Sequence, residues 1–306
     1  MALSGVLVEL NAVLVAVTAD EPRVLTIQDG KALPSGAFES THRSLQMGVR
    51  SWVERQTHHP LGYIEQLYTF ADRGRTEAGD DRVISISYLG LTREAQAAGR
   101  EVPGWRNWYL YFPWEDWRDG APALVEKAIA PRLRAWQAAS PDAITRRDRE
   151  RRIEVNFALT DRRWNEELVL QRYELLYEAR LVPEAGGRRP VADPIAGEPM
   201  MHDHRRILAT GIARLRSKIK YRPVVFELMA ESFTLLQLQR AVEALAGRRL
   251  HKQNFRRLIE QQGLVEPTQE RATKTGGRPA KLVRFRREVL VERAVAGTKL
   301  PMSRSA

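Results

Sequence analysis

Apolar and polar residues alternate along the first ninety positions in a way typical of β-strands. Two β-branched runs, at 12–17 and 23–27, flank a turn-like Thr-Ala-Asp-Glu-Pro segment and predict a β-hairpin. Further strands are expected at 64–70 and 82–91, where the alternation is sustained. Over 42–56 the apolar residues recur at helical spacing instead. This part of the chain is therefore expected to combine strands with an amphipathic helix that buries one face.

The middle of the chain is expected to be largely helical. Helices are predicted over 123–137 and 164–181, and the charged run 146–152 is typical of a solvated helix face. Proline and glycine then gather in 183–199, which indicates a loop or linker. We place the boundary between two domains at about residue 200.

The last hundred residues follow the pattern of a winged helix-turn-helix domain. Thr234 and Gln237 form the capping-box pattern that opens a helix, and Gly247 and Gly263 stand where helices end. The expected elements, in chain order, are helices at 202–220, 224–230, 235–246 and 251–262 and strands at 264–268 and 281–286. Helices followed by a two-stranded wing are typical of this DNA-binding domain.

The charge balance changes at the same boundary. Residues 201–306 hold 23 Lys and Arg against 9 Asp and Glu, whereas residues 1–200 hold 26 against 29. A basic module joined to a nearly neutral one suggests that the basic part binds a polyanion. The alternative, a solvated basic tail, would need a disordered sequence, and the helical pattern argues against it.

The helix expected at 251–262 would present polar side chains to DNA. Its predicted inner stripe consists of Leu250, Phe255, Leu258 and Ile259. Arg, Lys, Asn and Gln match base edges in the major groove, while Arg278, Lys281 and Arg284 of the wing would reach phosphates or a minor groove. The residues predicted to contact DNA are Thr234, His251, Lys252, Gln253, Asn254, Arg256, Arg257, Arg278 and Lys281. The alternative is a small helical domain with a solvated basic face.

Composition excludes several other classes. A chain without cysteine has no disulfide scaffold, no thiolate zinc site and no cysteine nucleophile. The apolar run from Gly5 to Val17 is 13 residues long, contains Glu9 and Asn11, and is too short to span a bilayer. With 43% apolar residues, a sizeable core is expected. We therefore expect a soluble, cytoplasmic protein with no membrane partner.

Residues 36–58 have the spacing of a Nudix box, the loop-helix-loop motif that holds Mg²⁺ in nucleotide pyrophosphatases. Gly36, Arg50 and Glu54 match its polar and glycine positions, whereas His42, Ser51 and Arg55 stand at usual glutamate positions and Thr57 at that of a glycine. Mg²⁺ needs several carboxylates on one helix face. We therefore expect a Nudix-like domain with no metal site and no catalytic residues, in which Glu54 is an ordinary partner of Arg50.

A degenerate Nudix domain followed by a winged helix resembles the bacterial Nudix-related regulators of NAD biosynthesis, the NrtR-like and NadQ-like proteins. The sequences that carry this resemblance are 63–70, 202–208, 233–235, 254–257 and 277–280. The implied fold is α/β: a Nudix-like α/β/α sandwich followed by a C-terminal winged helix-turn-helix domain. The expected divisions are a sensing domain at 1–200 with an insertion at about 120–160, a linker helix at 201–220, the winged helix at 221–290 and a tail at 291–306.

The resemblance also implies a homodimeric repressor that needs no cofactor and senses an adenine nucleotide, namely ADP-ribose, NAD or ATP. A nucleotide site needs aromatic faces for the base and cations for the phosphates. The residues predicted for it are Phe38, Arg43, Arg50, Tyr68, Arg75 and Trp108. Different nucleotide affinities of two dimer arrangements would change the spacing of the recognition helices on a near-palindromic DNA operator.

Two alternatives stay open. One is a Nudix-type pyrophosphatase with relocated metal ligands among Glu39, Glu54 and Glu65. The other is an RNA-binding module that uses the basic third of the chain.

Overall fold

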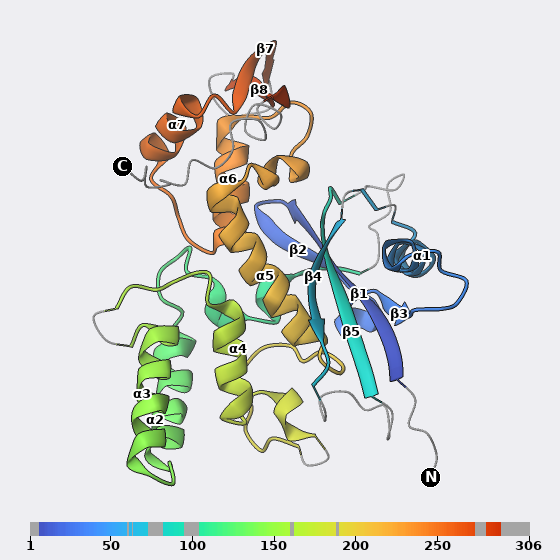
Figure 1. Ribbon diagram of the computed structural model, residues 1–306. Coiled ribbons are helices and arrows are strands. Elements are labelled where there is room, and N and C mark those ends of the chain that lie inside the picture. Colours follow the sequence, from blue (N-terminus) through green and yellow to red (C-terminus); the bar gives the residue numbers. More distant parts are fainter. Residues whose placement is uncertain are drawn as a thin grey trace, which may run out of the picture.

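A mixed sheet with helices on both faces forms the larger part of the molecule, and a small helical unit with its own two-stranded sheet lies at one end (Figure 1). The computed structural model describes residues 6–59, 61–62, 64–72, 82–94, 104–159, 162–187, 190–272 and 280–288 of the 306-residue chain.

In the described ranges, six strands form the main sheet, and the longest, at residues 6–18, lies at its centre. The strands are β1 Val6–Thr18, β2 Glu21–Leu25, β3 Ser35–Ala37, β4 Ile64–Phe70, β5 Arg82–Leu91 and β6 Trp105–Asn107. Their order is β4-β5-β1-β2-β6, and β3 pairs with β1 as well. β1 and β5 are parallel and the other pairs are antiparallel. The predicted hairpin and the strands predicted at 64–70 and 82–91 are confirmed.

β1 is apolar at most positions because both faces of the sheet are covered. Leu10 and Leu14 pack with α1 (Leu45–Thr57), whereas Val13 and Val15 belong to the larger core on the other side, which includes α5 (His204–Tyr221). A strand buried on both faces has a continuous apolar run rather than an alternating one. The α/β/α sandwich is therefore confirmed.

α5, the helix predicted as a linker, is one of the layers of the sandwich. Gly211 in this helix lies directly against Val13, and a Cβ at this position would come within 2.8 Å of Val13 Cγ1. The glycine thus lets the helix approach the sheet closely. α5 continues beyond the sheet and contacts α6 (Leu235–Ala246), so it is shared by both parts of the molecule.

The middle region forms short turns and a helical hairpin. Its elements are the 3₁₀-turns η2 Trp108–Leu110 and η3 Pro113–Glu115, the π-helix η4 Val125–Ile129, α2 Ala130–Ala138, α3 Ala143–Phe157, α4 Val169–Glu178 and the 3₁₀-turn η5 Pro183–Gly186. α2 and α3 pack together and project from the sandwich (Figure 1). α4 begins later than predicted, because Trp164 leaves the helical path to stack on Trp117, with ring centroids 4.2 Å apart.

The C-terminal unit has the helices and wing that the sequence predicts. It consists of the 3₁₀-turn η6 Val224–Leu228, α6, α7 Lys252–Gln261, β7 Val265–Ala272 and β8 Ala280–Phe285. β7 and β8 form the antiparallel wing, and Phe233 adds a bridge to Val283 of β8. The helix predicted at 224–230 is instead a 3₁₀-turn of five residues, and 3₁₀ geometry of this kind is frequent in connections between helices.

One hydrophobic core runs across the predicted boundary at residue 200. Val13 and Leu133 of the sandwich part and Leu238 and Phe255 of the winged helix belong to the same cluster of buried side chains. None of the helices in the described ranges combines the length and apolarity needed to cross a bilayer.

Candidate nucleic-acid interface

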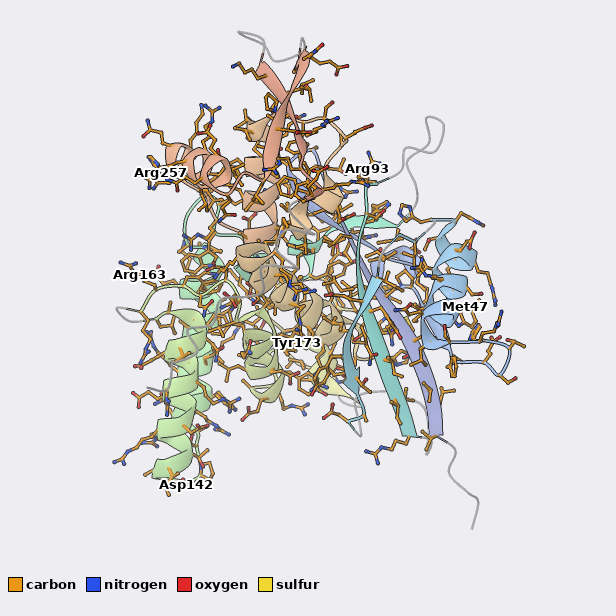
Figure 2. The ribbon with its side chains drawn as sticks, turned by 45° about the horizontal axis from the view of Figure 1, so that its top comes forward. Met47, Arg93, Asp142, Arg163, Tyr173 and Arg257 are labelled. Atoms are coloured by element: carbon orange, nitrogen blue, oxygen red, sulfur yellow. The ribbon has the colours of Figure 1, made fainter. Side chains whose placement is uncertain are left out.

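α7 has one buried face and one polar face. Phe255 and Ile259, four residues apart, are each 8% exposed and anchor the helix to the unit. The exposed polar residues of its N-terminal half are His251, Lys252, Gln253, Asn254, Arg256 and Arg257. In the described part of the chain, none of these side chains makes a hydrogen bond or an ion pair, and Arg257 extends away from the body of the molecule (Figure 2). Their donors and acceptors are therefore available to a partner.

The prediction for Leu258 is wrong. Its side chain is 51% exposed and does not belong to the inner stripe. At 3.6 residues per turn, residue 258 is rotated by about 60° from residue 255 and by about 100° from residue 259, which puts it at the edge of the buried face. Phe255 and Ile259 hold the helix against the domain, and the Leu258 side chain beside them remains exposed to solvent.

Thr234 serves the start of α6 instead of reaching outward. It is 8% exposed, its Oγ1 accepts a hydrogen bond from the Gln237 backbone N–H at 3.1 Å, and Gln237 Oε1 accepts from the Thr234 backbone N–H at 2.7 Å. This is the capping box that the sequence predicts. Because the Thr234 hydroxyl is buried and already hydrogen-bonded within this cap, the structure argues against a DNA contact by its side chain.

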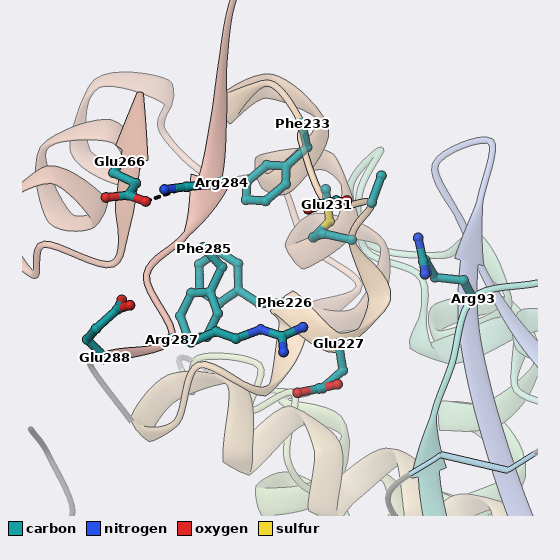
Figure 3. A pocket seen from close by; sticks show the side chains of 12 residues that line it. Arg93, Phe226, Glu227, Glu231, Phe233, Glu266, Arg284, Phe285, Arg287 and Glu288 are labelled. Carbon is teal, nitrogen blue, oxygen red and sulfur yellow. Dashed lines mark hydrogen bonds and ion pairs between the residues drawn. The ribbon is translucent and has the colours of Figure 1, made fainter. Parts of the chain in front are cut away.

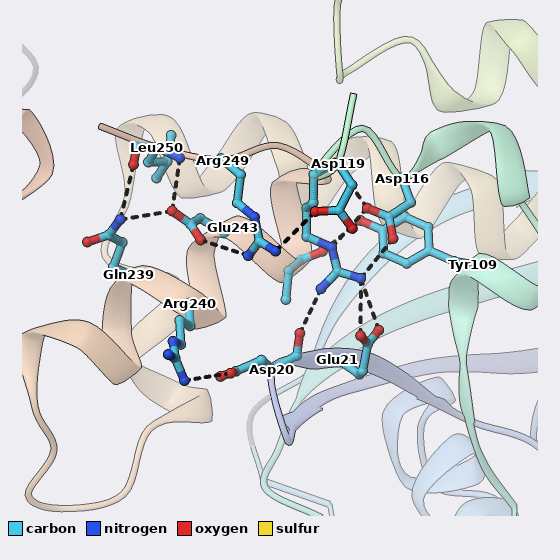
Figure 4. Close-up of polar contacts among 12 residues, drawn as sticks. Asp20, Glu21, Tyr109, Asp116, Asp119, Gln239, Arg240, Glu243, Arg249 and Leu250 are labelled. Carbon is cyan, nitrogen blue, oxygen red and sulfur yellow. Dashed lines mark hydrogen bonds and ion pairs between the residues drawn. The ribbon is translucent and has the colours of Figure 1, made fainter. Parts of the chain in front are cut away.

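A buried carboxylate holds the turn between α6 and α7 (Figure 4). Glu243 is 5% exposed, and its Oε1 accepts hydrogen bonds from Gln239 Nε2 at 2.8 Å and from the Leu250 backbone N–H at 2.9 Å. Its second oxygen accepts from Arg249 at 3.3 Å. A carboxylate with several donors fixes local geometry better than a single contact does. Glu243 thereby positions the residues that lead directly into α7.

The wing supplies fewer of the predicted residues. Lys281 is exposed on β8, and Arg284 pairs with Glu266 across the wing. Arg278 lies outside the described residues.

An ion-pair cluster lies at the contact between the sandwich and the winged helix. Glu115 is 1% exposed and accepts hydrogen bonds from two fully buried guanidinium groups, Arg172 Nε at 2.5 Å and Arg216 Nη1 at 2.6 Å. Arg172 comes from α4 and Arg216 from α5. Because two arginines share one carboxylate, the remaining donors need backbone acceptors to offset the loss of water.

Those acceptors include the end of α6. Arg216 Nε donates to the Leu245 carbonyl at 2.9 Å, and the Tyr109 hydroxyl donates to the Ala244 carbonyl at 2.7 Å. Gly247 follows at a φ of +70°, its carbonyl accepts from the Trp117 backbone N–H at 2.7 Å, and a Cβ there would collide with the Glu115 carbonyl. Burial raises the pKa of Tyr109, so its hydroxyl stays protonated and remains a donor. The winged helix is thus joined to the sandwich by specific polar contacts.

The degenerate Nudix box forms β3, a loop and α1, as its spacing predicts. His42 Nδ1 accepts from the Glu39 backbone N–H at 3.0 Å, and Arg55 donates to Ser51 Oγ at 3.2 Å. Glu54 is exposed and has no ion pair with Arg50. Arg50 instead donates to the carbonyls of residues 61 and 62, at 2.5 and 2.7 Å, because the loop after α1 returns beside it. The predicted Glu54–Arg50 pair is therefore wrong.

The carboxylates proposed as relocated metal ligands lie on different elements. Glu39 is in the loop before α1 and Glu54 is on α1, whereas Glu65 on β4 pairs with Lys218 of α5. In the described ranges, no three His, Cys, Asp or Glu side chains gather as metal ligands would.

The predicted nucleotide residues do not form one pocket. Phe38 is 37% exposed and its ring lies 5.8 Å from that of His42, and Arg43 is exposed in the same loop. Tyr68 lies beside Phe70, with ring centroids 4.8 Å apart, and Phe70 packs in the core on the α5 side of the sheet. The Nudix-box residues therefore lie apart from Tyr68.

Trp108 and Arg75 are the other two residues predicted for nucleotide binding. Trp108 is fully buried in the large core, so its ring has no face open to a base, and the structure contradicts its assignment to a nucleotide site. Its place in an aromatic-rich segment did not distinguish a core residue from a binding residue. Arg75 lies outside the described residues.

A cavity of about 760 Å³ lies between the end of β5 and the base of the wing (Figure 3). Phe226 and Phe285 stack in it with centroids 4.2 Å apart, and Arg93 faces it from the sandwich. Its charged lining carries both signs: Arg93, Arg284 and Arg287 against Glu227, Glu231, Glu266 and Glu288. Among the described residues that line it, none is a residue predicted for nucleotide binding.

Sequence reasoning missed the residues that join the two parts. Glu115, Arg172 and Arg216 look like ordinary solvated charges in a single sequence, since no spacing relates residues that are 57 and 101 positions apart. The aromatic residues on both sides of Glu115 are the one feature of the sequence that points to a buried charge at this position.

Comparisons with known proteins agree with this architecture. Residues 225–285 match the model of the NrtR DNA-binding winged helix domain. The ADPR responsive transcriptional repressor NtrR of Acinetobacter baylyi is 40% identical over 83 residues, which are 27% of this chain and 33% of that protein, so the alignment spans about a third of the curated relative.

Solved structures match over nearly the whole chain. Shewanella oneidensis NrtR complexed with a 27-mer DNA has a TM-score of 0.54 at 20% identity, covering 93% of this chain and 95% of that one. A MutT/nudix family protein from Enterococcus faecalis has a TM-score of 0.52 at 17% identity, covering 94% and 88%. Residues 225–285 are therefore a winged helix domain of the NrtR type, carried on a chain whose overall fold is that of NrtR.

Proposed function

We propose that the protein is a DNA-binding transcriptional repressor of NAD biosynthesis genes whose Nudix-like sandwich senses an adenine nucleotide. The observation that carries the proposal is the face of α7, where base-reading side chains stand without intramolecular partners in the described chain. This face belongs to a domain that matches the NrtR winged helix model. A solvated basic face would not require Asn and Gln among the cations, whereas base readout uses both.

The geometry of α7 suggests which residues read bases. Gln253 and Arg257 are four residues apart and lie opposite the buried pair Phe255 and Ile259, so they point farthest from the domain. Arg257 fits a guanine and Asn254, beside it, fits an adenine. Lys252 and Arg256 lie to one side of this line and suit phosphates.

We further propose a homodimer on a near-palindromic operator. A winged helix reads only a few base pairs, and a two-fold pair of recognition helices doubles the site at a spacing set by the dimer.

The effector proposed is ADP-ribose, NAD or ATP, and no cofactor is required. The Acinetobacter baylyi relative is named as responsive to ADPR, which favours ADP-ribose. Phe38, Arg43 and Arg50 are the candidate contacts: the first two lie in the loop before α1, Arg50 lies on α1, and together they offer one aromatic face and two cations. Tyr68, on β4, and Arg75 stay in the proposal as further candidate contacts.

The sandwich is proposed to be catalytically inactive. Glu54 alone keeps its carboxylate among the usual metal positions, and Arg55 beside it repels a cation. Incubation of the protein with Mg²⁺ and ADP-ribose should give no turnover above the buffer control. Hydrolysis at the rates of ordinary pyrophosphatases would refute this part and favour the enzyme alternative.

The DNA-binding proposal is tested with the full chain and a duplex operator selected from random sequence. Arg257→Ala should weaken operator binding by about 1–3 kcal/mol and relax the preference at one base pair. Arg147→Ala, on the exposed face of α3, is the matched control and should leave affinity unchanged. Equal affinity of the Arg257 variant and the wild type, or tighter binding to structured RNA at the same salt, would overturn the proposal.

A further inference from the structure

We propose that a second basic surface contacts DNA phosphates outside the base pairs read by α7. This surface, the flanking patch, consists of Arg162, Arg163, Arg248 and Arg249. The inference rests on the proposed DNA binding and extends it, because two of the four residues belong to the sandwich part of the chain.

Arg248 and Arg249 occupy the turn that leads into α7. They follow Gly247, and their side chains are 52% and 58% exposed. Arg249 lies three residues before Lys252, so the two Cα atoms are at most about 11 Å apart. That distance is a fraction of one turn of a duplex, which is about 34 Å long. A duplex whose backbone lies against Lys252 therefore passes within reach of the turn.

The loop at 162–168 lies against the same turn. Glu166 pairs with Arg248 at 3.5 Å, and its backbone carbonyl accepts from the buried Arg216 at 3.1 Å. Trp164 fixes the start of the loop, since it stacks on Trp117 and has the Arg172 guanidinium 3.8 Å from its ring centroid. This loop is thus held in place by contacts to both the ion-pair cluster and the turn before α7.

Arg162 and Arg163 project from that loop. Both are exposed, and within the described ranges neither has a hydrogen bond or an ion pair. Figure 2 shows Arg163 and Arg257 on the same side of the molecule, both directed outward. The unpaired cations thus extend the basic surface of α7 across the domain contact and onto the sandwich.

Phosphate is the partner that this chemistry fits. Guanidinium groups bind phosphate oxygens in bidentate fashion, and unpaired arginines keep all their donors for it. Arg248 pairs with Glu166, and Arg249 pairs with Glu243 and Asp119, but both guanidinium side chains are more than half exposed, so donors of each remain open to a phosphate. An acidic protein would also suit the charge, but continuity with α7 favours the duplex that α7 itself contacts.

The test compares two duplexes with the double variant Arg162→Ala/Arg163→Ala in the full chain. One duplex carries the operator with ten further base pairs on each side, and the other ends at the operator. The variant should bind the long duplex roughly tenfold more weakly and the short one as the wild type does, and its salt slope on the long duplex should fall by about 2, one per lost phosphate contact.

Controls separate this proposal from the one on which it rests. Arg134→Ala/Arg147→Ala removes two exposed arginines of α2 and α3 that have no ion pair within the part of the chain that the structure describes, and should change neither affinity nor slope. Arg257→Ala should weaken both duplexes equally. If Arg257→Ala acts and the flanking-patch variant binds the long duplex normally, or weakens both duplexes alike, the flanking patch is refuted alone; if Arg257→Ala also has no effect, the DNA-binding proposal itself fails.

Discussion

Glu115 shows how much depends on a single buried side chain. It neutralises one of two guanidinium groups, and the carbonyls of α6 and of neighbouring loops satisfy the donors that remain. Buried ion pairs add little net stability when complete, but removing one partner leaves an uncompensated charge. Glu115 and its two arginines therefore have their main effect in fixing how the end of α6 meets the sandwich.

Arg216→Met should lower the free energy of unfolding by about 3–5 kcal/mol, because it leaves Glu115 with one partner and the Leu245 carbonyl without its donor. Urea denaturation measures the change. Arg214→Met is the matched control on the same helix, since Arg214 is exposed, and should cost less than about 0.5 kcal/mol. Equal stabilities of the two variants would mean that the cluster does not hold the domains.

His204 makes stability depend on pH. It is 2% exposed, its Nδ1 accepts from the Leu33 backbone N–H at 2.8 Å, and burial lowers its pKa to about 4 from 6.5. The unfolded state binds the proton more readily than the folded state does. The contribution of neutral His204 to the free energy of unfolding is therefore fully present above pH 6.5 and is lost as the pH falls toward 4, by about 3 kcal/mol in total. Urea titrations at several pH values should show this loss. His204→Gln should flatten this part of the profile while the exposed His251→Gln should not, and a wild-type profile flat between pH 6.5 and 4 would contradict the assignment.

At the scale of elements, α7 is held by fewer residues than its apolar pattern suggests. Phe255 and Ile259 anchor it, and Leu258 remains half exposed at the edge of the contact. A recognition helix held along a narrow stripe keeps most of its circumference for DNA, which is what its polar residues require.

The neighbours Leu258 and Ile259 provide a direct comparison. Ile259→Ala should cost about 2–5 kcal/mol because it leaves a cavity beside α6. Leu258→Ala should cost less than about 0.5 kcal/mol, since its side chain is already in contact with water. Thermal unfolding followed by circular dichroism measures both. A large loss for Leu258→Ala would show that another part of the chain covers that side chain.

At the scale of the whole molecule, the two modules share one core. Val13 of β1 and Val283 of β8 belong to the same cluster of buried side chains, and α5 is a layer of the sandwich as well as a support of α6. A nucleotide bound to the sandwich would therefore act on DNA binding through a firm contact and not through a flexible linker. In the proposed homodimer, a change in the arrangement of the two protomers would therefore move the recognition helices with the sandwich.

This arrangement predicts that the described sandwich and winged helix unfold together. Differential scanning calorimetry should show one endotherm, with a calorimetric enthalpy close to the van't Hoff enthalpy. Arg216→Met, which weakens the contact between the parts, should broaden or split it. Two resolved transitions in the wild type would mean that the modules are thermodynamically independent despite their shared core.

The sequence by itself determined the elements that local rules control. Alternation located β4 and β5, a turn placed the β1–β2 hairpin, and the capping box and glycines set the ends of α6. The polar face of α7 was also predictable, because helical spacing alone separates it from Phe255 and Ile259. The spacing of the Nudix box placed α1, since an amphipathic helix needs only its own stripe.

Only the tertiary structure decided what depends on residues far apart in the chain. It shows that α5 is a layer of the sandwich, that Trp108 is buried and that Leu258 is half exposed. It also shows that Arg172 and Arg216, which look like surface charges in the sequence, are buried partners of Glu115. It also brought the loop at 162–168 to the turn before α7, which no local pattern indicates. The reason is physical: periodicity reports which face of an element is apolar, whereas burial of a charge or an edge depends on which other element covers it.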